Sequence, residues 1–183
     1  MLFSISIVEI LYSASPRFGI DGVVIQAESP AWGSPLELWN DTALFIHSEG
    51  QKKPVVLLIE DNTADALLVE EALREYRIDC HLAVLNDGEK AIGFLQAIDA
   101  NPHSALPDLV LLDLNLPKRS GHEILSRIRE SARCPTVPVV VVSSSQAESD
   151  LIRAKQLGIT AYFHKPASFD EFMRLGALVK DLL

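Results

Sequence analysis

Three acidic side chains stand where apolar runs of the sequence end. Glu60 and Asp61 directly follow Val55–Ile59, and Asp113 directly follows Leu109–Leu112. Clustered carboxylates repel one another, and their pKa values rise unless a cation neutralises them. Mg²⁺ suits such a cluster, because it binds through one or two carboxylates and keeps water and phosphate oxygens as its other ligands. The pattern therefore predicts a Mg²⁺ site.

Two further groups suit the transfer of a phosphoryl group. Ser143 directly follows the apolar run 139–142. The apolar run 161–163 is followed by His164 and then Lys165. A carboxylate can act as the nucleophile and form an aspartyl phosphate. The transfer then depends on neutralising charge at the phosphoryl oxygens, for which Lys165 offers a cation and Ser143 a hydroxyl donor. One such residue alone would be read as a turn or cap residue, so the prediction rests on four strand ends with compatible chemistry.

The elements that would position these groups are five strands alternating with helices. Two of the runs are continuous and rich in β-branched residues, which is typical of parallel strands covered on both faces. Apolar residues at helical spacing separate the runs. The pattern predicts an α/β fold with a doubly wound five-stranded parallel sheet and helices on both faces, whose ligands bind beyond the carboxyl ends of the strands. The expected strands are 55–59, 82–85, 109–112, 139–142 and 161–163, and the expected helical faces lie within 68–76, 87–98, 124–128, 147–157 and 169–179.

The chain changes character near residue 53. Residues 1–53 contain scattered proline and glycine and only short apolar stretches, so they are expected to form a poorly structured extension of unknown role. Residues 54–183 are expected to form the whole α/β domain.

Composition limits the classes of function. The chain of 183 residues has 16 Lys and Arg against 25 Asp and Glu, a net charge of −9, which disfavours sequence-independent binding to nucleic acid. The early apolar run contains Glu9 and has no basic start, so neither a secretory signal nor a membrane span is expected. Cys80 and Cys134 are too few for a disulfide framework, and two reduced thiols in a cytoplasmic protein are expected.

Several charged and histidine side chains are expected to be ordinary. Lys118 follows Pro117 in a loop and reads as solvated charge. The three histidines at 81, 103 and 122 share no metal-ligand spacing and are expected at the surface or in loops, whereas His164 is expected to pack.

The acidic motifs resemble those of response-regulator receiver domains. The resemblance rests on Val-Val-Leu-Leu-Ile-Glu-Asp-Asn at 55–62, on Asp-Leu-Val-Leu-Leu-Asp-Leu-Asn-Leu-Pro at 108–117 followed by Gly121, on Ser143, and on Tyr-Phe-His-Lys-Pro at 162–166. It covers residues 54–183 and implies the flavodoxin-like strand order 2-1-3-4-5. Asp-Leu-Asn-Leu-Pro and the long 99–107 connection are similar to single-domain regulators associated with cyanobacterial phytochromes.

The resemblance implies a role for each matching residue. Asp113 would be the phosphoacceptor, taking a phosphoryl group from the phosphohistidine of a kinase. Glu60, Asp61 and Asp113 would bind Mg²⁺ together with the backbone carbonyl of Asn115, and Lys165 would contact the phosphoryl group.

The same resemblance implies a switch. Ser143 would be the hydroxyl that moves toward the phosphoryl group, with Ser in place of the Thr that many family members have, and Tyr162 would follow it inward. The bond from Lys165 to Pro166 is expected to be cis.

The leading hypothesis is a phosphorylation-controlled switch without an output domain, which catalyses its own phosphotransfer and dephosphorylation and has no separate turnover substrate. Its expected partners are a sensor histidine kinase, with a phytochrome as one candidate, or a phosphotransfer protein. The downstream target is expected at the face formed by 147–157, 161–163 and 169–179, through which a homodimer could also form.

Two alternatives stay open at this point. The first is a receiver-like interaction domain that is never phosphorylated, against which the intact acids and Lys165 argue. The second is an aspartate-nucleophile phosphatase. Such enzymes have an Asp-x-Asp-x-Thr signature after the first strand, whereas here the candidate nucleophile follows the third, and Asp113-Leu114-Asn115 lacks the second acid.

Overall fold

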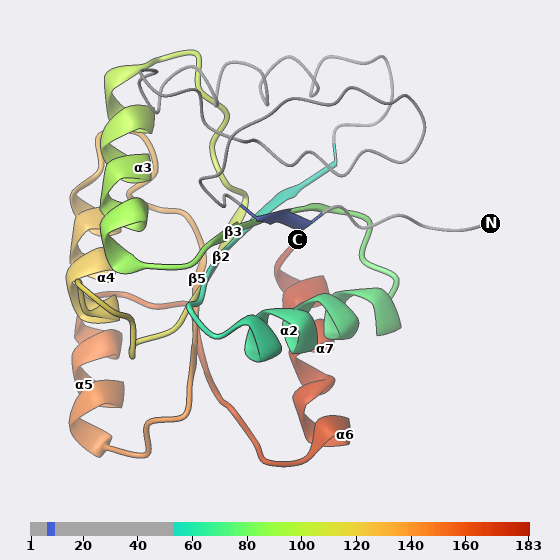
Figure 1. Cartoon of the computed structure of the whole chain (residues 1–183). Coiled ribbons are helices and arrows are strands. Elements are labelled where there is room, and N and C mark those ends of the chain that lie inside the picture. The colour runs from blue at the N-terminus through green and yellow to red at the C-terminus, as the bar shows by residue number, and fades with distance from the viewer. Residues whose placement is uncertain (1–6, 10–52) are drawn as a thin grey trace.

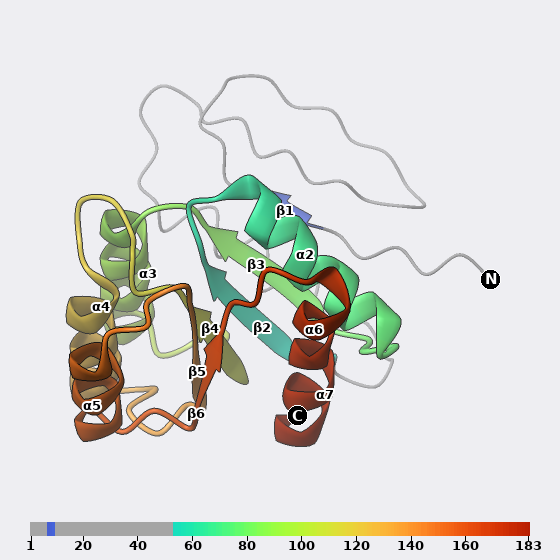
Figure 2. The same ribbon diagram turned by 90° about the horizontal axis from the view of Figure 1, so that it is seen from below.

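The computed structural model describes residues 7–9 and 53–183, and its strands form one parallel sheet. The order across the sheet is β1-β3-β2-β4-β5-β6. Figure 2 shows the strands side by side with helices on both faces. The strands are β1 (Ile7–Glu9), β2 (Val55–Ile59), β3 (His81–Leu85), β4 (Leu109–Leu112), β5 (Val139–Ser143) and β6 (Ala161–His164).

The predicted strand order 2-1-3-4-5 is confirmed by strands β2 to β6. The order reverses between β2 and β4, so the carboxyl ends of these two neighbours open onto the crevice where such folds bind ligands. The sixth strand, β1, pairs with the outer edge of β3 and was not predicted, because no helical pattern follows Ile7–Glu9 in the sequence as one follows each of the other five strands. The rest of the predicted extension lies outside the described residues, apart from Lys53, so the boundary at residue 53 stays a prediction.

The helices form two layers around the sheet. Figure 1 shows α3, α4 and α5 on one face of the sheet and α2, α6 and α7 on the other. Leu57 and Ile59 pack with the first layer, and Val56 and Leu58 with the second, as alternation along a strand requires. The helices are α2 (Thr63–Glu75), α3 (Gly88–Ala100), α4 (Gly121–Glu130), α5 (Glu148–Gln156), α6 (Phe169–Phe172) and α7 (Arg174–Leu182).

Three expectations about residues in the helices are wrong. The helical face expected within 169–179 belongs to two helices, which meet at Met173. Phe169, expected on the buried side, is 54% exposed, because it begins the short α6 and not the middle of a long helix. His122, expected at the surface, is buried in α4, where its ring lies 3.3 Å from the carbonyl oxygen of Asp150.

Two further properties of the described residues concern their helices and their cysteines. Their helices all lack the length and apolar composition needed to cross a bilayer. Cys80 and Cys134 are free and buried, and burial raises the pKa of the Cys80 thiol to about 11.

Candidate functional site

The site lies at the carboxyl ends of β2 and β4, where acidic residues surround one ammonium group. Lys165, just after β6, places its Nζ 2.7 Å from Glu60 Oε2 and 2.7 Å from Asp113 Oδ2. All three side chains are almost completely buried. Burial alone would disfavour charge on Lys165, but its hydrogen bonds to the carboxylates outweigh burial and raise its pKa. The structure thus unites three of the predicted residues.

The acids also fit a hard divalent cation. Glu60, Asp61 and Asp113 can each offer one carboxylate oxygen, all within 4.8 Å of one another. Burial raises the pKa of Glu60 to about 7, and the charge of Asp113 adds to this effect while Lys165 opposes it. A cation bound between Glu60 and the exposed Asp61 would favour their charged forms, and carboxylate oxygens are ligands that Mg²⁺ accepts.

A fourth acid, Asp65, completes the surroundings of Lys165. Asp65 lies in the first turn of α2, and its Oδ2 is 2.7 Å from Lys165 Nζ. Its role was not predicted from the sequence, because an acid is ordinary in the first turn of a helix. The pattern contained one usable signal: Asp65 is placed by the same strand-to-helix turn that carries Glu60 and Asp61.

Short-range hydrogen bonds hold the turns after β2 and β4. Glu60 Oε1 accepts from the backbone N–H of Asn62 at 3.1 Å, and the Asn62 side chain caps α2. Asp113 Oδ1 accepts from the backbone N–H of Asn115 at 3.0 Å. Each carboxylate is therefore oriented by its own turn before it meets Lys165.

The loop after Asp113 is also tied to the neighbouring helix α3. Lys118 Nζ lies 2.8 Å from Asp87 Oδ2, and the backbone N–H of Gly88 donates to the Pro117 carbonyl at 3.3 Å. Lys118 was expected to be solvated charge, so this ion pair is a second feature that was not predicted from the sequence. The pair restrains the loop that contains Asn115.

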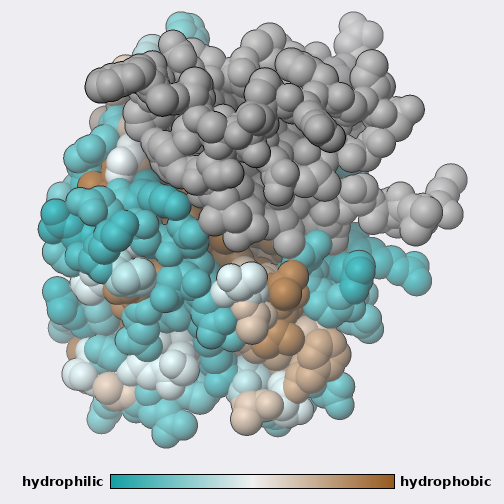
Figure 3. Space-filling view, viewed as in Figure 1, coloured by the Kyte–Doolittle hydropathy of each residue, from teal (hydrophilic) through white to brown (hydrophobic). Residues whose placement is uncertain are grey.

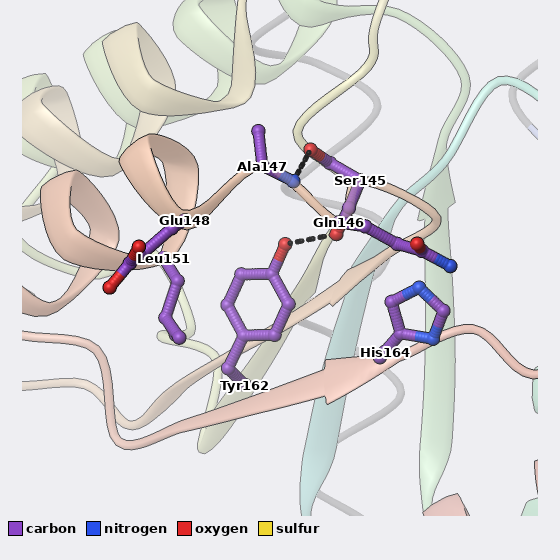
Figure 4. Close-up of a pocket in the computed structure, with 7 residues that line it drawn as sticks. All are labelled: Ser145, Gln146, Ala147, Glu148, Leu151, Tyr162 and His164. Carbon is purple, nitrogen blue, oxygen red and sulfur yellow. Dashed lines mark hydrogen bonds between the residues drawn. The ribbon is translucent and has the colours of Figure 1, made fainter.

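The predicted switch residues lie together beside the acids. Ser143 is fully buried, and its Oγ accepts from the backbone N–H of Ser145 at 3.2 Å. The hydroxyl of Tyr162 donates to the Ser145 carbonyl at 3.2 Å, as Figure 4 shows. The backbone N–H of Lys165 donates to the Ser143 carbonyl at 2.9 Å, which joins this group to the acidic cluster.

Two expectations around Lys165 are wrong. Among the described residues no peptide bond is cis, so the bond to Pro166 is trans, the isomer that costs less in an unstrained chain. His164 does not pack in the interior but is exposed and lines a groove with Tyr162 and Ser145 (Figure 4). It alternates with Lys165 along the chain, so its side chain leaves the acidic cluster.

Comparisons with known proteins agree with this geometry. A family model described as the response regulator receiver domain matches residues 56–175. The chain is 38% identical over 127 residues to the response regulator Rcp1 of Synechocystis sp., covering 69% of this chain and 86% of Rcp1. It is 38% identical over 133 residues to a probable methanogenesis regulatory protein, FilR2, of Methanothrix harundinacea, covering 73% and 85%.

Solved structures show the same similarity. The phosphorylated cyanobacterial phytochrome response regulator RcpA superposes with a TM-score of 0.64 at 32% identity, covering 70% of this chain and 92% of RcpA. The Mn²⁺-bound form of Rcp1 superposes with a TM-score of 0.63 at 37% identity, with the same two coverages.

Proposed function

Since this chain belongs to the response regulator receiver domain family, we propose that Asp113 is its phosphoacceptor. The chain is a phosphorylation-controlled regulator of a two-component system. The observation that carries the proposal for Asp113 is its position at the carboxyl end of β4, buried and 2.7 Å from the Lys165 ammonium. The phosphatase and the phosphorylation-independent domain are not favoured.

The metal ion in the proposal is Mg²⁺. Its ligands would be carboxylate oxygens of Glu60, Asp61 and Asp113 and the backbone carbonyl of Asn115. The crowded acids support this, as does the relative Rcp1, whose structure contains Mn²⁺. When bound, the ion supplies positive charge beside the carboxylate and phosphoryl oxygens.

The chemical step needs little from the protein beyond position and charge. A carboxylate oxygen of Asp113 attacks the phosphorus of a phosphohistidine, the P–O bond forms as the P–N bond breaks, and the nitrogen retains the electron pair. Lys165 donates to a phosphoryl oxygen and lowers the energy of the charge there. Hydrolysis of the acyl phosphate at the same site would reset the switch without a separate turnover substrate.

The phosphorylated state would reach the surface through Ser143 and Tyr162. Ser143 would turn its hydroxyl toward the phosphoryl group, which disrupts its hydrogen bond from Ser145 and frees Tyr162 to move inward. The face formed by α5, β6, α6 and α7 would then change its affinity for a target protein or a second copy of the chain.

The proposed phosphodonor is a histidine kinase, with a phytochrome as a candidate because RcpA is a phytochrome response regulator. Its docking surface would include Leu67 on α2 and Phe169 on α6, which are 53% and 54% exposed. Leu67 follows Asp65 by two residues and Phe169 follows Lys165 by four, so both lie on helices that begin close in sequence to residues of the site. In Figure 3 hydrophobic residues gather where α2, α6 and α7 lie in Figure 1.

The proposed compartment is the cytoplasm. Cys80 and Cys134 are free and buried thiols, which supports a reducing compartment.

The test is Phos-tag electrophoresis of wild type and Asp113→Asn after incubation with acetyl phosphate, with and without Mg²⁺. We expect a shifted band only in wild type with Mg²⁺. A shifted band in the variant would contradict Asp113 as acceptor. If neither protein gives a shifted band, binding of beryllofluoride to wild type is measured through the NMR chemical shifts of residues near Asp113. Binding would support Asp113 as the acceptor. No binding would favour the phosphorylation-independent interaction domain.

A further inference from the structure

Lys165 uses its whole donor capacity in this structure. An ammonium group has three N–H donors. Three carboxylates, those of Glu60, Asp65 and Asp113, lie at 2.7 Å, a short distance typical of charge-assisted hydrogen bonds. No donor remains for a phosphoryl oxygen, so one of these hydrogen bonds must break before Lys165 can contact that group.

The three carboxylates differ in what the proposed function requires of them. Asp113 becomes an acyl phosphate and loses its charge, and Glu60 is needed by the metal ion. Asp65 is neither the proposed phosphoacceptor nor a proposed ligand of the metal ion. Its side chain is 25% exposed, against 1% for Glu60 and 7% for Asp113. It is therefore the partner that Lys165 can keep in every state of the cycle.

The backbone fixes Asp65 independently of Lys165. The Asn62 side chain caps α2 by accepting from the N–H groups of Ala64 and Asp65, at 2.9 and 3.4 Å. The carboxylate thus belongs to a capped helix, while Lys165 lies on the separate segment that follows β6. An anchor on a rigid element can hold a long side chain whose other partners are taken away.

We infer that Asp65 is a positioning residue of the phosphorylation site, which holds Lys165 beside Asp113 and occupies one of its three N–H donors, so that this donor does not compete with the metal ion for the oxygens of Glu60 and Asp113. The inference rests on the proposed function for its metal ion. Without Asp65, the ammonium would pair more closely with Glu60 and Asp113 and compete with the cation. Removing the charge of Asp65 would also weaken cation binding through space, so the two effects must be separated.

The experiment compares Asp65→Asn with Glu89→Gln, which also removes one charge from the first turn of a helix. Mg²⁺ affinity is measured by amide chemical-shift titration. We expect Asp65→Asn to weaken binding by about three- to tenfold, the range for one charge near a divalent ion at partly screened distance, and Glu89→Gln by less than about twofold. Equal affinities for wild type and Asp65→Asn would overturn the inference.

A double-mutant cycle separates the two effects. Asp65→Asn is repeated in a Lys165→Met background, and folding is checked by the dispersion of the amide spectrum. If Asp65 acts through Lys165, its effect on Mg²⁺ affinity shrinks by about half or more on a logarithmic scale. The same loss in both backgrounds would mean that Asp65 acts only as a nearby charge, which contradicts a positioning role.

A readout without metal keeps the inference independent of the proposed function. The ¹⁵Nζ ammonium signal of Lys165 is recorded with EDTA, where slow hydrogen exchange reports its hydrogen bonds. We expect exchange to accelerate in Asp65→Asn and to stay unchanged in Glu89→Gln. If wild type bound no Mg²⁺ yet this difference in exchange appeared, the proposed function would fail while the positioning role of Asp65 would stand. If exchange at Lys165 did not change in Asp65→Asn, the positioning role would be contradicted.

Discussion

Among the single residues of the site, Glu60 carries a charge that is unfavourable without a bound cation. Burial raises its pKa from 4.5 to about 7. Between these values the folded state binds more protons than the unfolded state, so this contribution to stability is full below about pH 4.5 and is lost as pH rises through about 7. A cation bound beside Glu60 would offset the cost of charging this buried carboxyl group.

Glu60→Gln should therefore flatten the pH dependence of stability. The free energy of unfolding of wild type in EDTA should fall, relative to the variant, by about 1–3 kcal/mol between pH 4.5 and pH 8. Urea unfolding at fixed ionic strength across this range measures the difference. Parallel curves for the two proteins would contradict a raised pKa for Glu60.

The sequence reveals residues at strand ends better than residues on neighbouring helices. Glu60, Asp113 and Lys165 were predictable because the carboxyl ends of parallel strands share one edge of the sheet. Asp65 and the Lys118–Asp87 pair were not, because their partners are 100 and 31 residues away in sequence and no local pattern encodes that contact. The residues at the strand ends, which carry the proposed chemistry, could be predicted from the sequence. The residues that hold them in place could not, because tertiary packing brings them together.

At the scale of elements, α4 begins against the backbone of the site. A Cβ on Gly121 would lie 2.3 Å from the Asp113 carbonyl oxygen and 2.6 Å from the Leu114 Cα, both backbone atoms. Gly93, on the exposed side of α3, has nothing within 4 Å of such a Cβ. The two glycines therefore form a matched pair for one substitution.

Gly121→Ala should destabilise the protein by about 1–3 kcal/mol and weaken Mg²⁺ binding, because the backbone around Asp113 must shift. Gly93→Ala should stabilise it by about 0.5–1 kcal/mol through helix propensity, with unchanged Mg²⁺ binding. Urea unfolding and chemical-shift titration measure the two quantities. If Gly121→Ala changed neither the free energy of unfolding nor the Mg²⁺ affinity, α4 would be able to move without disturbing the site.

Element types were predictable where short apolar runs alternate with helical patterns, and were missed where that alternation is absent. The five runs were assigned to strands correctly because each crosses a sheet covered on both faces. The division at Met173 and the exposure of Phe169 were missed, because spacing alone does not show where a helix leaves the core. The sequence likewise contained no sign that Ile7–Glu9 pairs with β3.

At the scale of the whole molecule, the segment before residue 54 adds only β1 to the described sheet. Along β3 the backbone groups alternate in direction: His81 and Leu85 bond toward β2, so Leu82 and Val84 face β1. The domain boundary proposed at residue 53 leaves all of the acids in one unit.

Deletion of residues 1–53 should leave Mg²⁺ affinity within about twofold, because no proposed ligand precedes Glu60 and the site lies at the β2–β4 crevice. The amides of Leu82 and Val84 should exchange faster with deuterium, since they lose the edge strand, while Ala83 should keep its protection. Large loss of Mg²⁺ binding would show that the boundary is misplaced.

Three of the exposed apolar residues divide between the two helical layers. Leu67 and Phe169 lie on α2 and α6 in one layer, whereas Ile152 lies on α5 in the other layer and is 48% exposed. If α2 and α6 receive the kinase, the first two residues should affect phosphotransfer and the third should not. All three contribute little to the core, so their replacement should not unfold the protein.

Leu67→Ser and Phe169→Ser should each slow phosphotransfer from an autophosphorylated histidine kinase that labels wild type, by about tenfold, the effect of losing about 1.4 kcal/mol of apolar contact. Labelling by acetyl phosphate, which needs no docking, should remain at the wild-type rate. Ile152→Ser is the control and should leave both rates unchanged. Rates are read as radiolabel transferred from ³²P-kinase over seconds to minutes. Equal slowing by acetyl phosphate would mean that the substitutions disturb the site itself, and slowing by Ile152→Ser alone would move the kinase to the α5 layer.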